Sequence, residues 1–130
     1  MHPAYFETCF LVADLEPWPL EFAILSAYAT TGEQWTPERN QVADRVLEAE
    51  LLDTTRWMRR LTGFSPISGH AEPSWAVQLP FATACDVGLR YQQDAIYFVA
   101  GDDLSVSFCD ARRRLIQIGR FRERLRLATP

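Results

Sequence analysis

The chain of 130 residues contains no lysine, and Asn40 is its only asparagine. All 13 basic residues are therefore arginines. Folding does not require this bias, because lysine serves as well as arginine on most protein surfaces. Codons for lysine and asparagine are scarce in GC-rich genomes, so the bias indicates a GC-rich bacterial source.

Long apolar runs are also absent, and no stretch approaches the roughly 18 residues of a membrane-spanning helix. The N-terminal sequence has no basic leader, and Glu7 and Asp14 interrupt its apolar residues, unlike a signal peptide. Cys9, Cys85 and Cys109 are odd in number and lie in apolar sequence, which favours reduced core thiols over a disulfide frame or a zinc site. We therefore expect a soluble, cytoplasmic protein with no membrane partner.

Several enzyme signatures are missing. The sequence has no glycine-rich phosphate loop and no Gly-x-Ser-x-Gly elbow. It has only two histidines, His2 and His70, and neither accompanies a cysteine in a recognisable catalytic pattern. We therefore predict no cofactor and no metal, and we favour a protein that is not an enzyme.

Charge is distributed unevenly along the chain. Residues 1–110 carry 6 arginines against 16 acidic residues, a net charge of −10, and residues 111–130 carry 7 arginines against one glutamate, a net charge of +6. The basic end could bind nucleic acid or pack on the acidic remainder of the chain. The second interpretation is favoured, because nucleic-acid-binding domains are usually basic overall and this chain has a net charge of −4.

Hydrophobic periodicity and breaker residues predict the secondary structure. The expected elements are strands at 5–15, 20–28, 56–64 and 74–80, helices at 36–53 and 80–92, a hairpin at 95–108, and a strand at 112–127 with a bulge at Gly119. Thr36 is expected to cap the first helix, with Pro37 at its first position.

Two burial patterns follow from the same periodicities. The first helix is expected to bury a stripe made of Val42, Val46, Leu47, Ala49 and Leu51. The strand at 74–80 is expected to point Trp75, Val77 and Leu79 inward and Ser74, Ala76 and Gln78 outward.

From residue 20 onward the order is strand, helix, strand, strand, helix, strand. This order is typical of the split βαβ core of ferredoxin-like α+β folds, with two helices covering one face of an antiparallel sheet. Extra edge strands are expected at both chain ends, within a single domain of residues 1–130 whose arginine-rich strand extension covers residues 111–127.

Three segments, "FAILSAYATTGEQWTPERN", "GHAEPSWAV" and "ATACDVGLRYQQDAIYF", resemble the bacterial family named domain of unknown function 3293. The matching positions are Glu38, Asn40, His70, Glu72, Ser74, Tyr91, Gln93, Asp94, Ala95 and Ile96. The resemblance spans about residues 5–109. The family's Asn-Pro and Gln-Asn pairs are Ala29-Thr30 and Gln93-Asp94 here, and the family has no assigned activity, so the resemblance implies no mechanism.

Glu72 and His70 are the main candidates for chemistry. Two residues apart in an extended segment, they project from the same face and could share a proton or bind a ligand. A metal site would need a third ligand that the spacing does not supply. The alternative is that both side chains form hydrogen bonds that hold a loop, and this structural interpretation is favoured.

Two further groups are candidates for ligand binding. Gln93 and Asp94 lie at a helix-to-strand junction, where they would either hold backbone groups or line a pocket. Trp35 and Asn40 flank a helix N-terminus, where Trp35 could stack on a ligand or close the core over a loop.

The arginine-rich end supplies a last candidate. Arg120, Arg122, Arg124 and Arg126 would line one face of a strand and could contact phosphates. No pair of aromatic residues at the spacing of an RNA-binding sheet accompanies them, so a nucleic-acid partner is disfavoured. An exposed edge strand here could instead pair with a second copy of the chain.

We conclude that the sequence favours a binding module for a protein partner or a small polar ligand, held near Trp35, Asn40, His70, Glu72, Gln93 and Asp94. Two alternatives stay open: a hydrolase-like enzyme that uses Glu72 and His70, and nucleic-acid binding through the arginine-rich end.

Overall fold

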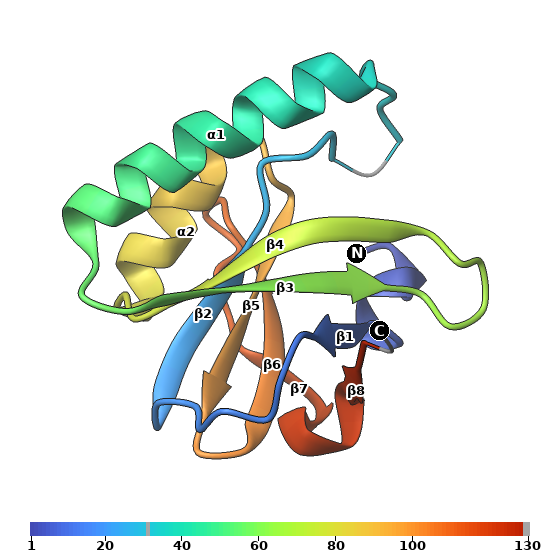
Figure 1. Cartoon of the computed structure of the whole chain (residues 1–130), viewed down its shortest axis with the longest axis vertical. Coiled ribbons are helices and arrows are strands. Elements are labelled where there is room, and N and C mark those ends of the chain that lie inside the picture. The colour runs from blue at the N-terminus through green and yellow to red at the C-terminus, as the bar shows by residue number, and fades with distance from the viewer. Residues whose placement is uncertain (31, 129–130) are drawn as a thin grey trace.

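The computed structural model describes residues 1–30 and 32–128. The helices lie on the same side of one strongly curled sheet, as Figure 1 shows. The elements in chain order are the 3₁₀ turn η1 (Pro3–Phe6), β1 (Cys9–Val12), β2 (Glu21–Leu25), α1 (Pro37–Thr54), β3 (Met58–Phe64), β4 (Ala71–Val77), α2 (Phe81–Arg90), β5 (Ala95–Ala100), β6 (Asp103–Phe108), β7 (Ile116–Arg120), the 3₁₀ turn η2 (Phe121–Arg124) and β8 (Leu125–Leu127). No helix in this part of the chain is long and apolar enough to cross a membrane.

The sheet contains eight strands in the order β7-β6-β5-β2-β4-β3-β1-β8. Its neighbouring strands are antiparallel except at one edge, where β1 and β8 pair in parallel through Phe10 and Leu125. The strands at the two ends of this order, β7 and β8, are joined by the short turn η2. The sheet therefore curls into a half-barrel (Figure 1).

The prediction of a ferredoxin-like split βαβ core is wrong. The sheet is mixed rather than antiparallel, and the strands at the two chain ends are part of one curled eight-stranded sheet rather than additions to a flat sandwich. Local periodicity does not report which distant strands pair, and twist accumulates over many strands until a sheet curls.

Both faces of this sheet are buried. One face packs under α1 and α2 through residues such as Val77, Leu25 and Ile96. The concave face holds a second core that includes Phe22, Tyr97 and Ala76 of β4. Ser74 and Ala76 are thus buried, at 6% and 0% exposure, and their predicted outward orientation toward solvent is wrong.

Helix α1 confirms the predicted capping but not the predicted stripe. The Thr36 hydroxyl accepts a hydrogen bond from the Arg39 backbone N–H, and Pro37 occupies the first turn. Leu47 and Leu51 are buried as predicted. The other three members of the stripe, Val42, Val46 and Ala49, are exposed, because the buried face of α1 instead includes Asp44.

Asp44 is held in that buried face by an ion pair. Its two carboxylate oxygens accept from the two terminal nitrogens of Arg60 on β3, at 2.8 and 2.7 Å. The Arg60 guanidinium also lies over the Trp75 ring, 4.3 Å from its centroid. This pair fixes α1 against the β3–β4 hairpin.

The C-terminal half agrees with its local signals. The hairpin predicted at 95–108 is confirmed, and β5 and β6 turn at Gly101-Asp102. Leu104 and Ser105 of β6 pair with Gly119 and Gln117, so Ile118 is an extra residue and the predicted bulge is confirmed.

The predicted strands at the chain ends are shorter than expected. The strand predicted at 112–127 is divided into β7 and β8 by the turn η2. The strand predicted at 5–15 begins only at Cys9, after the turn η1. In contrast, β4 begins at Ala71, within a segment that the sequence predicts to be a loop, and this places Glu72 in a strand.

Candidate functional site: a cavity at one end of the half-barrel

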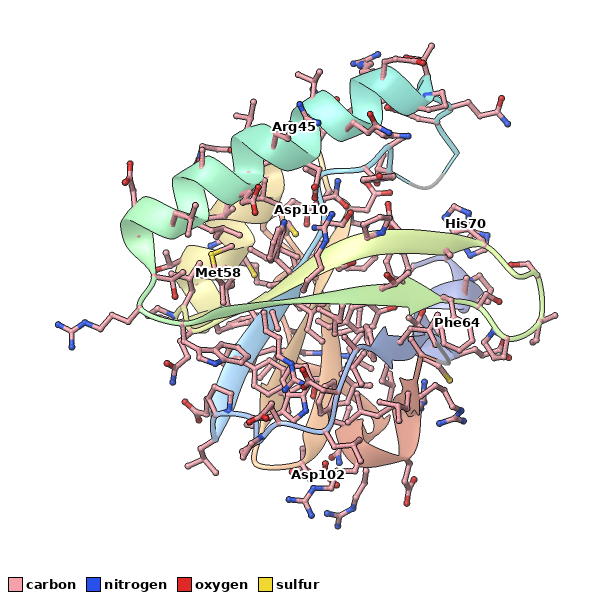
Figure 2. The ribbon with its side chains drawn as sticks, viewed as in Figure 1. Arg45, Met58, Phe64, His70, Asp102 and Asp110 are labelled. Atoms are coloured by element: carbon pink, nitrogen blue, oxygen red, sulfur yellow. The ribbon has the colours of Figure 1, made fainter. Side chains whose placement is uncertain are left out.

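One end of the half-barrel contains a cavity of about 290 Å³. The end of β3, the starts of β4 and β5, and the turn η1 surround it, together with the loop that follows β2. Figure 2 shows Phe64 and His70 at this end of the β3–β4 hairpin. The described residues that line it include Thr8, Phe10, Gly63, Phe64, His70, Glu72, Ser74, Gln93 and Tyr97.

A second cavity of about 260 Å³ adjoins the first. It lies beneath the loop between β2 and α1, and its lining includes Trp35 and Asn40. The two cavities share Ala29, Glu33, His70 and Glu72 as lining residues. Glu72 and His70 therefore stand on the boundary between two adjoining spaces.

Glu72 is the unusual group at this boundary. Burial raises the pKa of its carboxyl from the ordinary 4.5 to about 7, and a hydrogen bond with the Ser26 side chain opposes that rise in part. No arginine or histidine in the described part of the chain forms an ion pair with it. Its carboxylate is therefore partly removed from water without a cation at ion-pair distance.

Gln93 is the buried polar group nearest the start of β5, at 8% exposure. Its side-chain nitrogen donates to the Tyr28 and Tyr91 carbonyls, at 2.8 and 3.1 Å. Both amide hydrogens are thereby used, which leaves Oε1 as an acceptor with no donor among the described residues. Gln93 both holds backbone and lines the larger cavity, so the two roles that the sequence presented as alternatives coexist.

Tyr97 forms the floor of the larger cavity. Its hydroxyl lies 2.7 Å from the Thr8 hydroxyl and 3.0 Å from the Tyr5 carbonyl. Burial raises the pKa of its phenol, and the Glu72 charge adds to the rise. The Tyr97 ring packs edge-on against Phe10, with the ring centroids 5.3 Å apart.

His70 lies at the rim and is exposed. Its backbone N–H donates to the Ser68 hydroxyl, and its carbonyl accepts from the Ser65 N–H, so the backbone of the β3–β4 loop is fixed. No ion pair joins its ring to Glu72 in the described part of the chain. The shared proton that the spacing suggested is therefore not formed here.

Trp35 and Asn40 lie at the smaller cavity. The Asn40 side-chain oxygen accepts from the Ala29 backbone N–H at 2.9 Å, which holds the loop after β2 on the start of α1. The Arg39 guanidinium covers one face of the Trp35 ring, 3.9 Å from its centroid. That ring face is thus occupied by the chain itself.

Asp94 is exposed and lines neither cavity. Its backbone N–H donates to the Thr30 hydroxyl, and its carbonyl accepts from the Cys109 N–H. The geometry therefore gives the Asp94 side chain no place beside Glu72.

The arginines of the C-terminal segment do not share one strand face, because η2 interrupts the strand that would have aligned them. Arg124 points back into the fold and donates to the carbonyls of Thr8, Phe6 and Ile118. Arg126 donates to the carbonyls of its own neighbours, and Arg120 lies 4.0 Å from Asp102. The prediction that these four arginines line one strand face is therefore wrong, whereas their contact with phosphates stays an untested and disfavoured alternative.

Sequence reasoning did not single out Thr8, Ser26 or Tyr97, which now stand beside Glu72. Tyr97 lies in β5, and Thr8 and Ser26 lie beside β1 and β2 in segments with ordinary apolar patterns, so no motif distinguishes them. In the described residues, no group of three or more histidine, cysteine, aspartate or glutamate side chains is placed to hold a metal ion.

The family model described as protein of unknown function DUF3293 matches residues 25–96, more than half of the chain. The chain belongs to this family. The DUF3293 match covers Asn40, His70, Glu72 and Gln93 and ends at the start of β5, so it is shorter than the resemblance over residues 5–109. Neither a curated protein nor a solved structure matches the chain.

Proposed function

We propose that this member of the DUF3293 family is a cytoplasmic protein that binds a small polar ligand in the cavity at the end of the half-barrel. The observation that carries the proposal is Glu72, a desolvated carboxyl without an ion-pair partner in the described chain, on the wall shared by two adjoining cavities. A group of this kind costs stability, and such costs concentrate at functional sites.

The surroundings of Glu72 support the same proposal. The cavity combines aromatic walls with polar groups, and several of these groups are held in place by hydrogen bonds to the backbone. Small-molecule sites generally combine apolar walls with fixed polar groups in this way. Gln93 is fixed by two hydrogen bonds, so its free oxygen keeps a constant position. A volume of about 290 Å³ suits a ligand of small-molecule size.

Protein-observed NMR with a library of polar fragments tests this proposal. We expect binding fragments to shift the Gln93 side-chain amide and the backbone amides of Glu72 and Tyr97. Gly63 lines the cavity and offers a position for a blocking variant. A Cβ at this position would lie 3.5 Å from Thr8 Cγ2, which is an ordinary contact, and the further atoms of a larger side chain would enter the cavity. Gly63→Val should abolish the shifts while the protein stays folded. Shifts that persist in Gly63→Val, or that map elsewhere, would sink the proposal.

A second candidate function is acid–base catalysis by Glu72. The observation that favours it is the pKa of about 7, which leaves this carboxyl able to gain or lose a proton near neutral pH. Hydrolysis assays with Glu72→Gln separate the two functions. Catalysis predicts that turnover is lost while ligand affinity is retained, and binding alone predicts that no turnover exists to lose.

A further inference from the structure

We infer that the ligand of this cavity is a small organic cation, with an ammonium or amidinium head bound by Glu72 and Gln93 and an apolar stem against the aromatic wall. The inference rests on the proposed function, whose ligand class it specifies. It follows from the acceptors that Glu72 and Gln93 present, from the charges around the cavity and from its aromatic wall.

Three of the hydroxyls that line the larger cavity, those of Thr8, Ser74 and Tyr97, are already engaged as donors. The Thr8 hydroxyl donates to the Ala4 carbonyl at 2.9 Å, and the Ser74 hydroxyl donates to the Glu72 carbonyl at 3.1 Å. The Tyr97 hydroxyl lies within bonding distance of two acceptors, Thr8 Oγ1 and the Tyr5 carbonyl. A hydroxyl has one hydrogen to give, so none of these groups offers a donor to a ligand.

Two acceptors remain in the same space. One is the Glu72 carboxylate, and the other is the side-chain oxygen Oε1 of Gln93, a residue that is 8% exposed. Because the Tyr28 and Tyr91 carbonyls hold both hydrogens of the amide, it cannot rotate to present a donor without losing both bonds. An acceptor held in place by these two bonds offers a ligand N–H group a hydrogen bond in a fixed position.

Charge points to the same class of ligand. No arginine is among the described residues that line the two cavities, whereas Glu33 and Glu72 line both. An anion would therefore meet acidic side chains with no arginine to pair with it. A cation with several N–H groups satisfies Glu72 and Gln93 together, and charge-assisted hydrogen bonds of this kind are the stronger ones.

The apolar wall defines the remainder of the ligand. Phe10, Phe64 and Tyr97 line the larger cavity with aromatic rings. Such rings accommodate an apolar stem, and their faces attract a cation. An aromatic or short aliphatic amine therefore fits both parts of the cavity.

Binding of a cation should also release the proton that Glu72 holds at low pH. The other titratable side chains that line the cavities are two histidines, one glutamate and three tyrosines: His2, His70, Glu33, Tyr5, Tyr28 and Tyr97. Protonated histidines would also repel a cation at low pH, so a variant without the Glu72 carboxyl is needed to assign the effect.

The test is NMR titration with benzylammonium and benzamidinium, against benzyl alcohol and benzoate as controls of similar shape. We expect only the two cations to shift the Gln93 side-chain amide. Their affinity should rise roughly tenfold between about pH 6 and about pH 8, as a group with a pKa near 7 ionises. Glu72→Gln should weaken binding by about tenfold or more and remove most of this rise. Glu21→Gln is the matched control, because it removes one exposed carboxylate at the opposite end of β2.

The possible results separate the two proposals. If benzoate or benzyl alcohol binds in the cavity as tightly as the cations, the cation inference fails and the proposed function stands. An equal pH dependence in Glu72→Gln would assign the effect to the histidines and would also overturn the inference. If neither these compounds nor the fragment library shifts the cavity residues, both proposals fail.

Discussion

The side-chain nitrogen of Gln93 donates a hydrogen bond to the backbone carbonyl of Tyr28, with an N···O distance of 2.8 Å. The two residues lie 65 positions apart, in the turn before β5 and in the loop after β2. The same nitrogen also donates to the Tyr91 carbonyl. One buried amide thus joins two segments that border the candidate site, and its loss should be measurable as instability.

Gln93→Glu tests that link. A carboxylate cannot donate to the Tyr28 and Tyr91 carbonyls, so we expect the free energy of unfolding to fall by about 1–3 kcal/mol. Urea denaturation measures the change. Gln92→Glu is the matched control, since Gln92 is exposed and its side chain forms no bond within the described residues. An equal loss in both variants would contradict a specific role for Gln93.

Glu72→Gln should stabilise the protein at high pH. The folded state raises the pKa of Glu72 from 4.5 to about 7, so between these values the folded chain keeps a proton that the unfolded chain has released. The contribution of Glu72 to stability is therefore greatest below about pH 4.5 and falls as pH rises to about 7. Above about pH 7, the ionised Glu72 carboxyl should lower the free energy of unfolding by on the order of 3 kcal/mol.

Denaturant unfolding at about pH 5 and at about pH 8 checks this prediction. The amide that replaces the Glu72 carboxyl in this variant does not ionise. The free energy of unfolding of the variant should therefore rise relative to that of the wild type as pH increases. Glu21→Gln supplies the control, because Glu21 is exposed. The prediction is contradicted if the wild type becomes more stable relative to Glu72→Gln as pH rises. That result would show that the carboxylate is paired in solution.

Asp44→Asn should weaken the contact between α1 and β3. Asp44 is 9% exposed and accepts from both terminal nitrogens of Arg60. The Arg60 side chain remains 40% exposed, and water screens the pair, so we expect a loss of about 1–2 kcal/mol rather than that of a fully buried pair. Thermal unfolding measures it.

Asp53→Asn is the control on the same helix. Asp53 is exposed near the C-terminal end of α1, where a negative charge is unfavourable to the helix dipole, so its neutralisation should cost nothing. Equal stability of Asp44→Asn and the wild type would show that the ion pair contributes nothing to the docking of α1.

Arg124→Ala should destabilise the fold, and Arg122→Ala should not. The Arg124 guanidinium donates to carbonyls of the N-terminal segment and of β7, at 2.9, 3.0 and 2.7 Å, and so connects elements at both sheet edges. We expect a loss of about 2 kcal/mol, as for hydrogen bonds from a charged donor. The Arg122 side chain is exposed and has no partner among the described residues. Chemical denaturation of both variants measures the difference, and equal stability would contradict this role of Arg124.

Elements with strong local signals could be predicted from the sequence. Thr36 and Pro37 define the start of α1, and Gly101-Asp102 defines the β5–β6 turn, because capping and turn preferences act over a few residues. The bulge beside Gly119 was visible as a change in apolar parity. These features depend on neighbours in the sequence, and their predictions are confirmed.

Features that depend on distant neighbours were missed. The parallel pairing of Phe10 with Leu125 joins residues at opposite ends of the chain and leaves no local signature. Ser74 and Ala76 are suited to an exposed face by size and polarity, yet the curl of the sheet covers them. The ferredoxin-like prediction failed for the same reason, since element order does not determine how a sheet curls or which edge strands join it.

The candidate site could be predicted in part. Spacing alone placed His70 and Glu72 on one side of an extended segment, and both line the same cavity. Nothing in the sequence showed that Asn40 would hold the Ala29 backbone, that Asp94 would point away, or that Tyr97 would form the floor. Those outcomes depend on how the strand ends converge.

The most direct test of the binding site is a pH titration of the Glu72 side-chain carboxyl by carbon-13 NMR, with and without benzylammonium. The structure predicts a midpoint near pH 7 in the free protein, because the carboxyl is desolvated without a cationic partner. It also predicts a lower midpoint in the presence of the cation, because the bound charge favours the carboxylate. A midpoint near the ordinary 4.5 that the cation leaves unchanged would contradict the account.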